Sequence, residues 1–395
     1  MTTAQVQPKK TRRRLLALDI MRGITIAGMI LVNNPGSWGN KYAPLGHADW
    51  NGLTPTDLVF PFFMFIMGIS TFISLRKYNF SFTWPTLWKI IRRTIVIFAI
   101  GLAVAWLGLF LSGINNGKAV WDAAMNFDSI RILGVMPRLA ICYGSASIIA
   151  ILLKHRYLPA VIVSMLVLYT LLLIVGDGWE FSEDNIIAVV DRGVLGEAHM
   201  YTSSIDGVRI KFDPEGFLST LPSIAHVLIG FWCGMMMFDN RDNNQRVLKL
   251  FIVGTILTFV GLLLDYGFPI NKKIWSPTFV LTTCGLAASV LALLIWIIDI
   301  KGYKRWTKFF EVFGINPLFL YVFAAVLSIF FGRWRIACSS CEDGYTTIKA
   351  WLYDDVLVPA VTDMTFASLL YALIFVSISW AVGYVLYKKN IYIKI

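Results

Sequence analysis

Uncharged apolar runs of membrane-spanning length recur along almost the whole chain, and they restrict the possible folds more than any other feature. About 20 such residues, wound as a helix, cross the hydrocarbon core of a bilayer. Lipid offers no hydrogen-bond partners, so each crossing segment must satisfy its own backbone, and long apolar runs predict helices. With 57% hydrophobic and 15% charged residues, the chain is predicted to be an all-α polytopic membrane protein.

Hydropathy and loop breakers divide the sequence into about ten predicted transmembrane helices. They lie near residues 14–33, 56–75, 88–112, 131–153, 157–176, 217–238, 247–268, 277–300, 309–332 and 363–387. A basic segment, 1–13, precedes what we expect to be a single transmembrane domain over 14–395. The predicted external loops lie near 34–55, 177–216 and 333–362. The glycine spacing and short β-prone pieces of the second fit a small folded cap, the alternative being a flexible loop.

Positive charge gathers mainly on one side of the predicted helices, as the positive-inside rule requires. The clusters are QPKKTRRR, Arg76 with Lys77, Lys89 with Arg92 and Arg93, Lys154 with Arg156, Arg241 with Arg246, Lys301 with Lys304 and Arg305, and Lys388 with Lys389. The external side has a minority: Lys272, Lys273, Arg333 and Arg335. Both termini are therefore predicted to be cytoplasmic. The net charge of +11 reflects membrane orientation, and we expect no nucleic-acid partner. GINNGKA lacks the spacing of a phosphate loop, which argues against an ATP-driven pump.

His47 lies in the polar loop between the first two predicted helices, close in sequence to Asn33, Asn34 and Asp57. Imidazole has an ordinary pKa of about 6.5, so it can take a proton from an amine or hydroxyl near neutral pH. An aspartate can fix its tautomer, and an asparagine can stabilise a developing oxyanion. The pattern favours His47 as a general base or nucleophile, the alternative being an ordinary loop histidine.

Charged groups within apolar runs are costly and are usually paired or functional. Asp19 and Arg22 are three residues apart and predict an ion pair on one helix face. Arg138 lies seven residues beyond Arg131, roughly 10 Å deeper in a helix. It is expected either to meet an acid from another helix, such as Asp57 or Glu311, or to face an anionic ligand. Asn316-Pro317 predicts a local helix distortion.

Cys142, Cys233 and Cys284 lie within apolar runs and are predicted core residues. Cys338 and Cys341 are expected to form a local disulfide if their compartment is oxidising. They are too few to hold a metal, and we expect none. His226, inside the sixth predicted helix, most simply makes an interhelical hydrogen bond.

Several of these stretches resemble the heparan-α-glucosaminide N-acetyltransferase family of membrane acyltransferases. They are LDIMRGITIAGMILVNN, HADWNGLTPTDLVFPFFMFIMG, RILGVMPRLAICY, FDPEGFLSTLPSIAHVLIG, PINKKIWSPTFVLTT and FGINPLFLYV. They extend from residue 17 to about residue 322 and keep the family order. The block H-x-x-W-N-G-L-T followed by D-L-V-F-P is the most specific of them.

The resemblance implies that an acetyl group passes from cytoplasmic acetyl-CoA to the amino group of a glucosamine across the membrane. The essential histidine of the family falls on His47, and its assisting asparagine falls on Asn33, with Asn34 as the register alternative. Whether the histidine itself becomes acetylated, or the transfer occurs directly in a ternary complex, stays open. Asp57 is the expected third catalytic residue.

The donor is expected to run across the membrane between the helices. Arg92 and Arg93 would meet the CoA phosphates, and the pantetheine arm would pass Arg22 or Arg138. The other expected partners are the lipid bilayer and an amino-sugar or glycan, and a homodimer is among the open oligomeric states.

Compared with the family, the chain is expected to lack the N-terminal luminal domain and its preceding helix, and to lack an organelle-targeting segment. We therefore expect a bacterial inner-membrane form acting on a periplasmic sugar. Two alternatives stay open at this point. One is an O-acyltransferase of an envelope polysaccharide, and the other is a transporter for a sugar or organic anion with Arg138 as its counter-charge.

Overall fold

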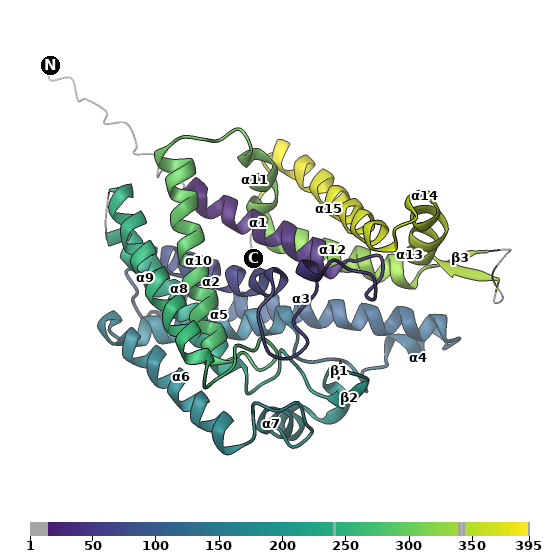
Figure 1. Cartoon of the computed structure of the whole chain (residues 1–395), viewed down its shortest axis with the longest axis horizontal. Coiled ribbons are helices and arrows are strands. Elements are labelled where there is room, and N and C mark those ends of the chain that lie inside the picture. The colour runs from purple at the N-terminus through teal and green to yellow at the C-terminus, as the bar shows by residue number, and fades with distance from the viewer. Residues whose placement is uncertain (1–14, 240–241, 339–340, 342–343, 394–395) are drawn as a thin grey trace.

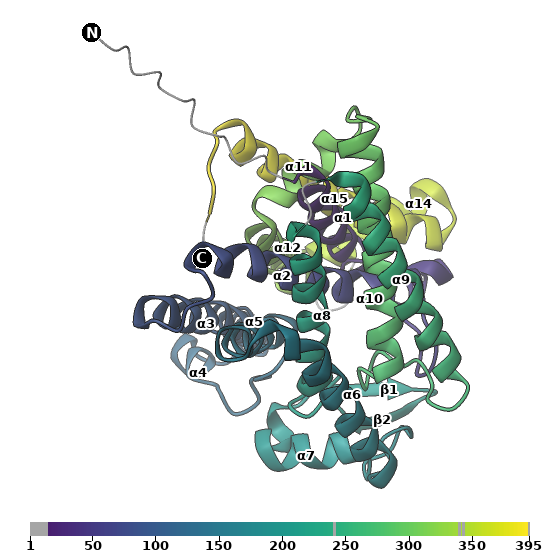
Figure 2. The same ribbon diagram turned by 90° about the vertical axis from the view of Figure 1, so that its left-hand side faces the viewer.

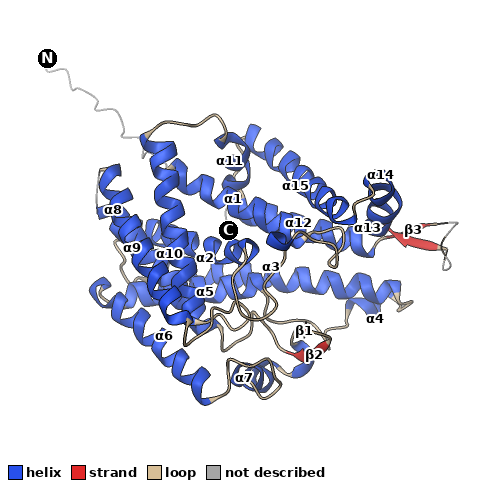
Figure 3. Ribbon diagram, viewed as in Figure 1, coloured by secondary structure: helices blue, strands red, loops and turns tan. Residues whose placement is uncertain are grey.

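The computed structural model describes residues 15–239, 242–338, 341 and 344–393 of the 395-residue chain. The basic segment 1–13, predicted to be cytoplasmic, lies outside the described residues. The fold is almost wholly helical (Figures 1 and 3). Its long helices are α1 (Leu16–Asn33), α2 (Val59–Leu75), α3 (Trp84–Asn115), α5 (Val135–Leu152), α6 (Leu158–Val175), α8 (Thr220–Asp239), α9 (Asn243–Asp265), α10 (Pro277–Leu294), α12 (Pro317–Arg333) and α15 (Met364–Lys388).

Nine helices of the described residues are long and apolar enough to cross a membrane, and a bent pair would make a tenth. This confirms the prediction of an all-α polytopic membrane protein. The bent pair is α11 (Thr307–Ile315) with α12, which meet at 84°. Pro317 has no backbone N–H to continue the helical ladder, and Asn316 leaves the helical region at ψ 57°. The predicted distortion at Asn316-Pro317 is therefore confirmed.

The helices differ in how much they face their neighbours. In the most apolar stretch of α1 and of α8, 67% of the residues are buried, against 6% in α3 and 17% in α9. Helices α3 and α9 therefore present apolar faces outward, as contact with lipid requires. Figure 2 shows α3 beside α5 and α9 beside α10. Close packing of α2 on α8 depends on Gly68, since an added Cβ there would lie 2.1 Å from the Val227 carbonyl oxygen.

The loop 177–216, which we call the cap, is folded, the first of the two forms that its sequence left open. It contains α7 (Ile186–Leu195) and a hairpin of β1 (Thr202–Ile205) with β2 (Val208–Lys211). Its own apolar cluster packs Phe212 against Ile274 of the α9–α10 loop, and the Tyr169 hydroxyl donates to the Ile274 carbonyl at 2.6 Å. The cap is thus anchored to the helix ends around it.

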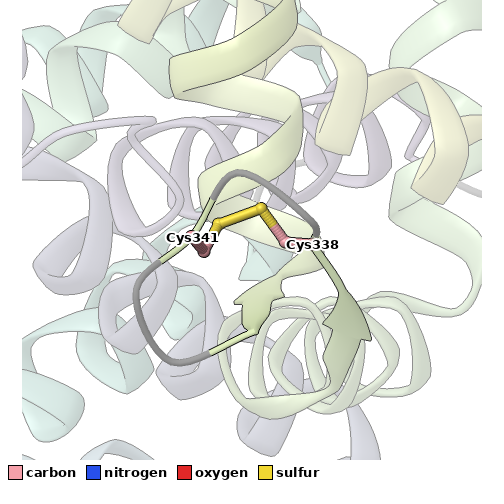
Figure 4. Close-up of a disulfide and its surroundings, with 2 residues drawn as sticks. All are labelled: Cys338 and Cys341. Carbon is pink, nitrogen blue, oxygen red and sulfur yellow. A yellow bond between two sulfur atoms is a disulfide. The ribbon is translucent and has the colours of Figure 1, made fainter.

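A second hairpin follows α12 and pairs β3 (Arg335–Ala337) with β4 (Tyr345–Thr347). A disulfide joins Cys338 to Cys341 at its tip, as expected (Figure 4). The shorter helices are α4 (Val120–Ala124), α13 (Ile348–Ala350) and α14 (Val358–Val361).

Two predictions for buried residues are confirmed. Cys142, Cys233 and Cys284 are buried free thiols. His226 Nε2 lies 2.9 Å from the Pro61 carbonyl oxygen of α2, an interhelical hydrogen bond.

Candidate active site

The loop that carries His47 is held by three contacts with other loops. The Trp50 indole donates to the Trp179 carbonyl of the cap at 2.8 Å, and the Gly52 N–H donates to the Ile270 carbonyl at 2.7 Å. The Asn271 amide donates to Asn51 Oδ1 at 3.1 Å. The loop between α1 and α2 is therefore fixed against both the cap and the α9–α10 loop, which gives His47 a defined position.

His47 and Asp57 form a hydrogen-bonded pair. His47 Nδ1 lies 2.7 Å from Asp57 Oδ1, and the Asp57 side chain is fully buried. Asp57 Oδ2 also accepts bonds from the Ala48 N–H and from the N–H and hydroxyl of Thr54. A carboxylate acceptor fixes the proton on Nδ1, which leaves the lone pair on Nε2. Among the described residues Nε2 has no hydrogen-bond partner, and the side chain is 41% exposed.

Lys272 completes the pair from the α9–α10 loop. Its Nζ lies 3.2 Å from Asp57 Oδ1 and 3.0 Å from His47 Nδ1. His47 Nδ1 cannot donate to Asp57 and accept from Lys272 at the same time. Because a carboxylate is a stronger acceptor than an imidazole nitrogen, both His47 Nδ1–H and the Lys272 ammonium are expected to donate to Asp57 Oδ1. Burial lowers the pKa of Lys272, although Asp57 and Glu215 oppose that effect.

Glu215 enters the same pocket from the segment between the cap hairpin and α8. Arg131 Nη2 contacts Glu215 Oε2 and Asp213 Oδ1, both at 2.5 Å, and Arg131 Nε donates to Asp213 Oδ2 at 2.9 Å. Burial alone would raise the pKa of Glu215. Arg131, with help from Arg138 and Lys272, outweighs burial and holds that pKa below its usual value.

His47, Asn33, Glu215, Lys272 and Tyr321 line one small cavity of about 80 Å³. An adjoining cavity of about 640 Å³ shares Asn33, Tyr321 and Met29 with it. The larger volume lies in the usual range for small-molecule sites, about 300–1,000 Å³. Asn33 is exposed to both cavities, whereas Asn34 is buried, donates to the Ile30 carbonyl at 2.7 Å and does not line the His47 pocket.

A third cavity, of about 380 Å³, lies between the same helices α1, α2, α5 and α12 and also reaches α3. Arg22 and Arg93 both line it. Arg22 lies 11 residues before Asn33 on α1, which is about 17 Å along the helix axis. Arg22 pairs with Asp19 at 2.9 Å, as predicted, and donates to Ser70 at 2.8 Å. Arg93 lies over the Tyr143 ring, and its buried Nε has no hydrogen-bond partner in the described part of the chain.

Two of the predicted arginines lie elsewhere. Arg92 is exposed on α3 and does not line the cavity of Arg22 and Arg93. Arg138 is fully buried, donates to the Gly216 carbonyl at 2.9 Å and to the Ser219 hydroxyl, and lies over the ring of Trp275. The predicted pairing of Arg138 with Asp57 or Glu311 is wrong. Helix α5 packs against the start of α8, and the residues just before α8 supply a carbonyl and a hydroxyl as acceptors for Arg138.

Lys272, Glu215 and Tyr321 were not anticipated as site residues. Lys272 and Glu215 stand in PINKK and FDPEG, charged segments of the predicted external loops, so their charge was a usable signal. Tyr321 gave none within its apolar run. The described part of the chain contains no group of three or more His, Cys, Asp or Glu side chains suited to a metal ion.

The fold and site define a polytopic α-helical membrane protein whose His–Asp pair faces a cavity between transmembrane helices. The profile of the family described as heparan-alpha-glucosaminide N-acetyltransferase, catalytic, matches residues 14–266, well over half of the chain. The chain belongs to this family.

Two curated relatives extend the match. Heparan-alpha-glucosaminide N-acetyltransferase of Mus musculus is 27% identical over 452 aligned residues, which cover 100% of this chain and 63% of the relative. The Homo sapiens protein of the same name is 26% identical over 437 residues, 97% of this chain and 60% of its own length. The chain thus spans less than two thirds of either relative.

Proposed function

We propose that this protein is an acetyltransferase of a bacterial inner membrane. It moves an acetyl group from cytoplasmic acetyl-CoA to the amino group of a glucosamine-type sugar on the periplasmic side. The observation that carries the proposal is the His47–Asp57 pair, whose free Nε2 shares a pocket with Asn33. Membership of the family and the names of the two relatives support the reaction class.

The pocket supplies the groups that this reaction needs. His47 Nε2 takes a proton from the acceptor amine as the new C–N bond forms and the C–S bond of the thioester breaks. Asp57 stabilises the resulting imidazolium, which then returns the proton to the leaving thiolate. The Asn33 amide is free to donate to the carbonyl oxygen as its negative charge develops.

The donor fits the cavity lined by Arg22 and Arg93. CoA carries phosphates, and guanidinium groups bind phosphate through several parallel hydrogen bonds. The buried Arg93 Nε has no hydrogen-bond partner within the described ranges, which suits a ligand acceptor at this place. Since this cavity and the His47 pocket lie between the same helices, an extended donor can hold its phosphates near one face and its thioester near the other.

The transporter hypothesis relied on Arg138 as the counter-charge for its substrate. That side chain instead bonds Gly216 and Ser219 and lines neither cavity. No specific observation favours it over acetyl transfer.

The test is transfer of labelled acetyl from acetyl-CoA to glucosamine by the purified protein. Wild type and His155→Ala, a matched histidine variant outside all three cavities, are expected to transfer label. His47→Ala is expected to fold and bind donor but not to transfer. An active His47→Ala would remove this histidine from the mechanism. Label retained on the wild-type protein without acceptor would assign an acetyl-histidine intermediate, and its absence a ternary complex.

A further inference from the structure

Glu215 has one oxygen in use and one available. Arg131 holds Oε2, whereas Oε1 has no hydrogen-bond partner among the described residues. The side chain is 15% exposed and lines the pocket of His47 and Asn33. The free oxygen of this ionised carboxylate, beside the candidate general base, can accept a hydrogen bond from a ligand that enters the pocket.

Arg131 does not need Glu215 for its own neutralisation. Asp213 already bonds that guanidinium through both of its oxygens and is fully buried. The two carboxylates therefore share one cation. If Glu215 served only to pair Arg131, it would repeat a contact that a better-buried neighbour makes with ideal bidentate geometry.

The charges around the pocket leave an excess of negative charge. Asp57 and Glu215 contribute two carboxylates and Lys272 contributes one ammonium, while Asp213 already neutralises Arg131. Lys273 lies over the Phe181 ring and does not line the pocket. Loss of a proton from Lys272 would only deepen the excess.

We propose that Glu215 binds the amino group of the acceptor, and that the excess negative charge of this pocket selects amines over hydroxyls. The inference rests on the proposed function and names its acceptor chemistry. An arriving ammonium would place one N–H on Glu215 Oε1 and balance the pocket. The amine gives one proton to water before reaction, keeps its hydrogen bond to Glu215, and passes another proton to His47 Nε2 as the C–N bond forms.

The experiment compares Glu215→Gln with Glu197→Gln, which removes the same charge from an exposed position of the cap. Glutamine keeps an oxygen that can accept from Arg131, so the fold should survive. A charge-assisted hydrogen bond contributes about 1.5–3 kcal/mol, or roughly 10–100-fold in binding. We expect the KM for glucosamine to rise by that factor in Glu215→Gln, while kcat at saturation and acetyl-CoA binding change little. Glu197→Gln should match wild type, and Glu215→Asp should recover part of the loss.

Direct binding of glucosamine and glucose, measured by calorimetry, separates this inference from the proposed function. Preference of wild type for glucosamine, lost in Glu215→Gln, supports the amine site even if no acetyl transfer is found. Acetyl transfer with an unchanged glucosamine KM in Glu215→Gln overturns the amine site and leaves the acetyltransferase standing. If the variant does not fold, equal binding of both sugars by wild type would overturn it as well.

Discussion

Asp57 joins local structure to chemistry at a single residue. Its Oδ2 caps the turn at Pro55–Leu58, and its Oδ1 holds both His47 and Lys272. Asp57→Asn keeps the shape but removes the charge, so Lys272 loses its counterion and His47 its fixed tautomer. We expect acetyl transfer to fall by about 10²–10⁴ and the melting temperature to drop. A rate within a few-fold of wild type would show that the carboxylate only caps the turn.

Asn33 is the residue expected to stabilise the oxyanion. Its side chain faces the His47 pocket, whereas the neighbouring Asn34 is buried against the Ile30 carbonyl. Asn33→Ala should therefore lower kcat by about 10²–10³ with little change in donor binding. Asn34→Ala is the matched control and should mainly lower stability. A larger loss of kcat in a folded Asn34→Ala would reverse the two assignments.

The sequence located the residues that lie close together along the chain and missed those that the fold brings in from afar. Asn33, His47 and Asp57 belong to one loop and its flanking helix ends, so local pattern was enough to group them. Lys272 and Glu215 reach the same pocket from loops that only tertiary packing can place there. The prediction of a partner for Arg138 was wrong for the same reason. A buried charge indicates that a partner exists, but the sequence does not show which residue it is.

At the scale of elements, the bend between α11 and α12 is tied to the C-terminal segment. The Asn316 amide donates to the Ile391 carbonyl and its oxygen accepts from the Ile393 N–H, both at 2.9 Å. Ile393, Pro317 and Leu318 line the cavity of Arg22 and Arg93. The bend therefore shapes the proposed donor site, and its position could be predicted from Asn316-Pro317 although its 84° angle could not.

Asn316→Ala tests this connection. The loss of these two partly buried hydrogen bonds, each contributing about 0.5–1.5 kcal/mol, should release the segment of Ile391 and Ile393. We expect the KM for acetyl-CoA to rise about tenfold, with the KM for glucosamine unchanged, in steady-state kinetics. Ser377→Ala, on an exposed part of α15, is the control. Equal increases in both KM values would point to general destabilisation instead.

The whole molecule has two ends that differ in chemistry. The cap, the His47 loop and the α9–α10 loop meet at one end, held by bonds such as that of Trp50 to Trp179. Arg22 and Arg93 face the cavity nearer the other end, where the α5–α6 turn with Lys154 also lies. If acetyl-CoA is the donor, as proposed, the end with Arg22 and Arg93 must face the cytoplasm, and the predicted charge distribution places the cytoplasm on that side as well.

Cysteine labelling measures this orientation. The described free thiols, Cys142, Cys233 and Cys284, are buried, and Cys338 is bonded to Cys341, so reaction of the native chain with a maleimide should be weak. Glu197→Cys in the cap and Lys154→Cys in the α5–α6 turn are both at exposed positions. With a membrane-impermeant maleimide on intact spheroplasts, only the cap variant should react, and permeabilisation should expose the other. The opposite pattern would place the cap and His47 on the cytoplasmic side. Donor and acceptor would then meet on one side of the membrane, and this result would overturn the proposal of acetyl transfer across it.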